Sequence, residues 1–265
     1  MDQFHDGQHV RLRNRRRGRY VRAAADGVSV TLSHRRASLN VAWTVHLYHS
    51  VDGDGLYLLL HSAAYGRYLA ATDMPLPGGH GRFRVEQRRY DQPEVRSIMW
   101  QAIGGGGGGF PNDVMLRNVG GLHLSVRVRG VRTMFCWDVE PIPAREAAPR
   151  LPPPLSFGQE EPRAERRIRV VQATAEGLYA DERWSQLQFF GRCVNHLRNA
   201  LARHLNLPRS PALVMCVRAG RHGRLTPLVV DLPHGGSGET LEVVVMLSGT
   251  LSLRCAAAPG CRCRV

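Results

Sequence analysis

The feature that most constrains the fold is an internal repeat. The stretch from His9 to Val21 matches the stretch from Tyr57 to Leu69 without a gap, at a constant offset of 48 residues. A weaker third copy runs from Val114 to Leu124 after a one-residue deletion. Each copy is followed by a tryptophan that closes a strand-like run, namely Trp43, Trp100 and Trp137. Three copies of one unit predict threefold pseudo-symmetry.

Each copy has the pattern of a two-stranded hairpin. An apolar alternating run meets a short turn that contains a glycine, and a second apolar or aromatic run follows. Such a hairpin cannot bury its apolar face alone, so three of them closing on one another predict a β-trefoil. Tyr20, Tyr68 and the three tryptophans are then expected in the shared core, because large aromatic side chains dominate core energetics.

The pattern becomes mixed in the second half of the chain. Strands are expected at Ile168–Val171 and at Leu187–Phe190, with an amphipathic helix from Arg192 to Leu205, where apolar residues recur at three- and four-residue steps. Further strands are expected at Leu213–Val217, Leu228–Val230 and Leu241–Leu247. The order of these elements predicts an α+β, ubiquitin-like β-grasp, so the whole chain is expected to be mainly β.

The glycine-arginine-tyrosine hairpins and their tryptophans resemble a fascin-like trefoil. The closest resemblance is to a plant family of unknown function whose first half is classed with actin-crosslinking folds, and it continues through Val217–Pro233. This resemblance implies the trefoil and β-grasp folds and no established activity. It suggests filamentous actin as a candidate partner.

Composition divides the chain into four segments. We predict a trefoil over residues 1–143, a proline-rich linker over 144–166, a β-grasp domain over 167–250 and a tail over 251–265. The tail carries Cys255, Cys261 and Cys263 and is expected to be disordered, since chain termini are poorly ordered unless they are tied down. Two glycine-rich stretches, 75–81 and 104–109, are expected to be loops.

The charge of the chain points to acidic partners. The net charge is +14 with a pI near 10.6, and all 36 basic residues are arginine. Seven of the twelve residues from Arg11 to Arg22 are arginines, whereas the equivalent turns of the other copies are Ala63–Tyr65 and Val119–Gly120. The repeat therefore does not require arginine there. The candidate binding residues are Arg13, Arg15, Arg16, Arg17 and Arg19, with a merely solvated turn as the alternative.

No motif for catalysis, phosphate cradling or metal binding emerges from the sequence. Cys193 and His196 lie three residues apart on the expected helix, but a buried cysteine beside an exposed histidine is favoured over a nucleophilic pair. Gly235–Gly238 joins two expected strands and is interpreted as a turn. We expect no catalytic residue, no metal and no cofactor.

The predicted function is therefore that of a non-enzymatic binding or scaffold protein that engages actin or another acidic protein surface. One alternative is nonspecific binding of nucleic acid or anionic lipid through the arginines. Another is a carbohydrate-binding trefoil, although Val41, Ile98 and Phe135 stand where ricin-type repeats carry glutamine. No secretory signal or transmembrane segment is evident, so we expect a cytoplasmic protein with reduced thiols, or alternatively a nuclear one.

Overall fold

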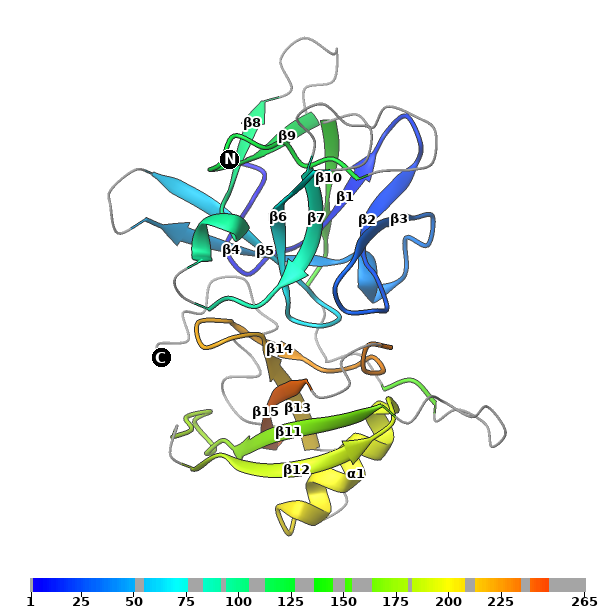
Figure 1. The fold of residues 1–265 in the computed structure, drawn as a ribbon, viewed down its shortest axis with the longest axis vertical. Helices are drawn as coiled ribbons and strands as arrows, with labels where there is room; N and C mark the ends of the chain where they lie inside the picture. The colour runs from blue at the N-terminus through cyan, green and yellow to red at the C-terminus, as the bar shows by residue number, and fades with distance from the viewer. Residues whose placement is uncertain are drawn as a thin grey trace.

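The computed structural model describes residues 2–50, 55–75, 83–91, 94–104, 113–126, 136–144, 151–153, 164–180, 183–207, 213–234 and 239–247. Figure 1 shows two domains stacked along the long axis of the molecule. Most of the linker, most of both glycine-rich loops, Gly235–Gly238 and the cysteine-containing tail lie outside the described residues. Within the described chain, no helix is long and apolar enough to cross a membrane.

The first domain is built on a closed ring of six strands. Its first lobe contains β1 (His9–Asn14), β2 (Arg19–Ala23), β3 (Val30–Ser33) and β4 (Trp43–His49), with a 3-10 turn at Leu39–Val41. Its second contains β5 (Leu56–Ser62), β6 (Tyr68–Pro75), β7 (Phe83–Arg88) and β8 (Trp100–Gly104), with a 3-10 turn at Glu94–Ile98. The third lobe contributes β9 (Asp113–Asn118) and β10 (Cys136–Ile142).

Antiparallel pairing closes the ring in the order β1, β4, β5, β8, β9, β10 and back to β1. The first and last strands of each lobe thus form the barrel, while β2 pairs with β3 and β6 with β7 as hairpins outside it. This arrangement is the β-trefoil that the repeat predicts.

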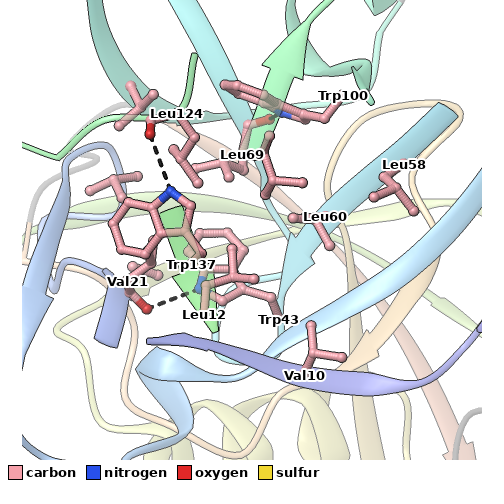
Figure 2. Close-up of a cluster of buried hydrophobic side chains, with 14 of the residues drawn as sticks. Val10, Leu12, Val21, Trp43, Leu58, Leu60, Leu69, Trp100, Leu124 and Trp137 are labelled. Carbon is pink, nitrogen blue, oxygen red and sulfur yellow. Dashed lines mark hydrogen bonds between the residues drawn. The ribbon is translucent and has the colours of Figure 1, made fainter. Parts of the chain in front are cut away.

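The three tryptophans occupy equivalent places in the trefoil core. Trp43, Trp100 and Trp137 are all fully buried, and each indole Nε1 donates to a backbone carbonyl of its own lobe. The acceptors are Val21 at 3.0 Å, Leu69 at 2.8 Å and Leu124 at 3.2 Å, which are aligned positions of the three sequence copies. Figure 2 shows these side chains within one apolar cluster. The structure therefore confirms the predicted threefold pseudo-symmetry and the structural role of the tryptophans.

This symmetry makes a quantitative prediction. Replacing any one of Trp43, Trp100 or Trp137 with phenylalanine removes a buried N–H donor and part of the ring volume, which should lower the free energy of unfolding by about 2 kcal/mol in each case. Urea denaturation of the three variants measures this. Trp184→Phe in the second domain is the control, because Trp184 is only partly buried. A core tryptophan that could be replaced at no cost would contradict energetic equivalence of the lobes.

The second domain is a five-stranded sheet with one helix packed on it. Its elements are β11 (Glu165–Gln172), β12 (Ser185–Phe190), α1 (Val194–His204), β13 (Leu213–Arg218), β14 (Leu225–Pro227) and β15 (Thr240–Leu247). The strand order is β12-β11-β15-β13-β14, with β11 and β15 parallel. Apolar residues of α1, including Val194, Leu197 and Leu201, pack on one face of the sheet. This is the expected ubiquitin-like architecture.

One expected strand was misplaced. The fourth strand of the domain is Leu225–Pro227, whereas the sequence pattern predicts Leu228–Val230. Leu228 is buried, and its backbone N–H donates to the Met215 carbonyl just beyond the ladder. Its apolar character therefore reflects packing beneath α1 rather than strand pairing, and an apolar run alone does not distinguish the two.

Candidate functional site

The first hairpin of the trefoil carries the candidate arginines on a well-defined turn. Asn14 Oδ1 accepts a hydrogen bond of 3.2 Å from the Arg17 backbone N–H, and Gly18 adopts a φ of +60° that closes the turn between β1 and β2. Figure 1 shows this turn at the end of the trefoil away from the second domain.

Two of the five candidate arginines are bound by acids of the same domain. Arg15 bridges Asp113 and Asp138, with N···O distances of 2.7 and 3.0 Å. Its hydrogen bond to Asp113 raises the Arg15 pKa above its ordinary value. Arg13 lies 3.7 Å from Glu140, which also binds Arg36 at 3.0 Å. Arg13 and Arg15 thus join the first hairpin to β9 and β10.

The other three arginines form the outward part of the turn. Arg16 is exposed, and Arg17 and Arg19 are partly exposed. Among the residues that the structure describes, none forms an ion pair with these three guanidinium groups. Their donors are therefore available to an external acidic group, while Arg13 and Arg15 hold the turn in place.

The equivalent turn of the second copy has a different surrounding. Ala63, Ala64 and Tyr65 are all buried, and Gly66 has a φ of +69°. A Cβ on Gly66 would lie 3.2 Å from both Thr226 and Val217 of the second domain. Ala64 and Tyr65 pack into the trefoil core and Gly66 faces the ubiquitin-like domain, so this turn has no solvent-exposed position equivalent to those of the arginines.

Backbone and charged contacts join the two domains. Tyr90 N–H donates to the Ala219 carbonyl at 2.8 Å, and His222 N–H donates back to the Tyr90 carbonyl at 3.1 Å. Glu239 accepts hydrogen bonds from both Arg67 and Arg89, the latter at 3.0 Å. The sequence did not predict this interface, because the residues that form it are widely separated along the chain and follow no periodic pattern. The only signal of it was the absence of arginine from the second turn.

A cluster of histidine and tyrosine side chains lies inside this interface. Tyr68 is fully buried, and its hydroxyl contacts His46 Nδ1 at 3.2 Å and accepts from the Arg224 backbone N–H at 3.1 Å. His61 Nδ1 lies 3.2 Å from Thr226 Oγ1. Burial lowers the pKa of His46 to about 3, assisted by the nearby charge of Arg224 and opposed by Asp6. Burial also lowers the His61 pKa well below its ordinary value. Both rings are therefore neutral at pH 7.

Cys193 and His196, which the sequence offered as a possible nucleophilic pair, differ in their exposure to solvent. Cys193 is buried at the start of α1 and His196 is exposed, as the sequence predicts. Within the described ranges, no group of three or more histidine, cysteine or acidic residues is arranged to hold a metal ion.

Leu151 of the proline-rich segment packs against the core beneath α1, and the Pro152 carbonyl accepts a hydrogen bond from Asn195 Nδ2 at 2.6 Å. This part of the segment is thus docked within its own chain.

Comparison with solved structures gives distant likenesses. A Caenorhabditis elegans protein of unknown function is 15% identical with a TM-score of 0.37, over 52% of this chain and 86% of that one. A GlcNAcα1-4Gal releasing endo-β-galactosidase from Clostridium perfringens is 16% identical with a TM-score of 0.35, over 51% of this chain and 33% of that one. No curated protein sequence gives a significant match. At this level of similarity the two structures do not bear on function.

Two family models match the chain, one in each domain. Residues 1–106 match a β-trefoil domain of unknown function, DUF569, and residues 164–246 match the DUF569-associated ubiquitin-like domain. The fascin-like and plant-specific parts of the resemblance remain predictions. The chain therefore carries a DUF569 β-trefoil domain followed by the ubiquitin-like domain that is associated with it.

Proposed function

We propose that this chain is a non-enzymatic binding protein that engages an acidic protein surface through Arg16, Arg17 and Arg19 of the first hairpin. The observation that supports this most is the inequality of the repeated turns. Gly66 of the second turn packs against the ubiquitin-like domain, whereas the first turn lies at the far end of the trefoil (Figure 1) and carries three arginines that are exposed or partly exposed. Guanidinium forks match carboxylate geometry and remain charged at any physiological pH.

The ion pairs that hold the turn in place favour binding of one specific acidic surface over nonspecific binding by a flexible, positively charged segment. Asp113, Asp138 and Glu140 bind Arg13 and Arg15, so the β1–β2 turn is fixed to two other strands of the barrel. A fixed turn loses less conformational entropy when it binds, and its arginines can match one spacing of acidic groups. Filamentous actin is the candidate partner that the family resemblance suggests.

The test is co-sedimentation of the full chain with filamentous actin across a salt series. The triple variant Arg16→Ser, Arg17→Ser, Arg19→Ser should bind at least about tenfold more weakly, since charge-assisted hydrogen bonds are lost. Its melting temperature should match that of the wild type. The control removes the same charge from exposed trefoil positions elsewhere, Arg35, Arg96 and Arg117, and should bind normally.

Arg15 is left intact in this design because its replacement would leave Asp113 and Asp138 facing each other without a cation. An Arg15→Ser variant should therefore melt at a lower temperature, unlike the triple variant. Equal and salt-labile binding to actin, RNA and acidic liposomes would refute a specific protein surface and favour generic polyanion binding. Full binding by the triple variant would refute the assignment of the site.

A further inference from the structure

The two edges of the ubiquitin-like sheet differ in what covers them. At one edge, β14 contacts the trefoil through Thr226, which is buried against His61. At the other edge, β12 pairs with β11 on its inner side, and Figure 1 shows it on the side of the domain away from the trefoil. Within the described part of the chain, no strand pairs with the outer side of β12.

The register shows which backbone groups face outward. Gly191 N–H donates to the Ala164 carbonyl at 3.1 Å, so this pair is hydrogen-bonded across the two strands. Pairs alternate along an antiparallel ladder, so Phe190, Gln188 and Gln186 occupy the non-bonded positions relative to β11. The N–H and C=O groups of these three residues therefore point outward in the plane of the sheet, on the side of β12 opposite β11. They form a row with which an added strand could pair.

This edge lacks the features that usually prevent pairing with another chain. The strand Ser-Gln-Leu-Gln-Phe-Phe has no charged residue and no proline, and its six pairs with β11 run without a bulge. Phe190 is 58% exposed at its end. An open, uncharged edge strand with an exposed aromatic is a template for an extended segment.

The charges around β12 indicate what kind of segment fits. At the Ser185 end, the Ser185 hydroxyl lies 2.9 Å from His204 Nε2, which places the end of α1 with exposed Arg203 beside the strand. Arg183 is also exposed at this end. At the Phe190 end the neighbour is an acid, Glu165, which pairs with Phe190 in register. Acidic groups of a ligand would thus be attracted to the Ser185 end, and apolar groups to Phe190.

We propose that β12 binds an extended, apolar peptide segment of a partner protein by strand addition, with acidic residues of that segment lying beside Arg183 and Arg203. A second copy of this chain fits the same edge less well, because each copy carries a net charge of +14 and long-range repulsion opposes their association. This surface is separate from the first hairpin, so the chain presents two partner-binding surfaces.

The experiment measures binding of fluorescein-labelled peptides to the full chain by fluorescence anisotropy. Each peptide is a short run of valine and isoleucine with glutamates at one end, made in both orders, with lysine-flanked versions as controls. We expect one or both glutamate-flanked orders to bind, and the lysine versions to bind at least about tenfold more weakly. Alternate N-methylation of the peptide should abolish binding by removing its backbone donors.

A proline substitution tests the edge itself. Gln188→Pro removes an outward N–H without breaking the ladder to β11, and should weaken peptide binding about tenfold. Gln188→Thr is the matched control, because it also loses the Gln188 side chain but keeps the N–H, and it should bind like the wild type. Circular dichroism checks that both variants fold.

Arg183→Ser with Arg203→Ser provides a test that does not depend on the proline variant. This double variant should lose the preference for glutamate-flanked peptides and most of the salt dependence of binding. No peptide binding, equal binding of lysine-flanked peptides, or unchanged binding by Gln188→Pro would overturn the proposal. Analytical ultracentrifugation showing a dimer that Gln188→Pro dissociates, without peptide binding, would instead assign the edge to a second copy and also overturn it.

Discussion

Replacing Glu239 with glutamine should separate the two domains. Glu239 is the shared acceptor for Arg67 and Arg89, and only 11% of the Arg67 side chain is exposed. Burial lowers the Arg67 pKa and the attraction of Glu239 opposes this, so the carboxylate compensates a desolvated guanidinium. Removing one member of a buried pair leaves an uncompensated charge, which should cost about 3 kcal/mol of docking free energy, or roughly a hundredfold in affinity.

The measurement uses the full chain with a protease site inserted into the proline-rich segment. After cleavage, the halves of the wild type should elute together from a gel-filtration column, and those of Glu239→Gln should separate. Glu242→Gln is the matched control, since Glu242 also binds two arginines, Arg169 and Arg218, but entirely within the second domain. Separation of the control halves, or retention of the Glu239→Gln halves, would contradict the role assigned to Glu239.

Acid should destabilise the protein well before its carboxylates titrate. His46 has a folded pKa of about 3 against an ordinary value of 6.5, and the His61 pKa is lowered in the same direction. Below pH 6.5 these histidines bind protons in the unfolded chain, whereas in the folded chain both rings stay neutral until the pH falls to their lowered pKa. Stability conferred by the neutral rings is therefore complete above pH 6.5 and is lost as pH falls below it. For two protons the slope approaches about 3 kcal/mol per pH unit.

Urea denaturation at pH 7, 6 and 5 measures this slope. The titratable and charged groups near the two rings are Arg224, Asp6, His9, Tyr68 and Tyr90, and the Thr226 hydroxyl lies 3.2 Å from His61 Nδ1. The His46→Gln variant should lose about half of the slope, since one of two protons is no longer taken up. His49→Gln on the same strand, at an exposed position, should leave it unchanged. A slope that is the same in wild type and His46→Gln would show that His46 does not couple folding to protons.

The trefoil could be predicted because each copy of the repeat is a short hairpin whose pattern is contained in one continuous stretch of sequence. The aligned positions of Val21, Leu69 and Leu124 are those that accept from the three core tryptophans, so the alignment of the copies described real structural equivalence. The helix was predicted for a similar reason, since Val194, Leu197 and Leu201 recur at helical spacing and are all fully buried.

The domain interface and the bracing of the arginines could not be predicted in this way. Arg15 and Asp138 are 123 residues apart in the chain and Arg67 and Glu239 are 172 apart, so no periodic pattern relates them. The residue type also does not show whether an arginine is bound by two acids, as Arg15 is, or faces solvent, as Arg16 does. The sequence thus located the first hairpin but did not separate Arg15 from Arg16.

Docking of the second turn against the ubiquitin-like domain has a consequence for how the chain would engage partners. If the first hairpin and β12 both bind, the interface holds them at one distance and one relative orientation. Once one surface is occupied, the other samples only a small volume, so a bivalent target with the matching spacing gains a high effective concentration. A target with a different spacing gains none. The chain would then discriminate among assemblies by their dimensions as well as by their chemistry.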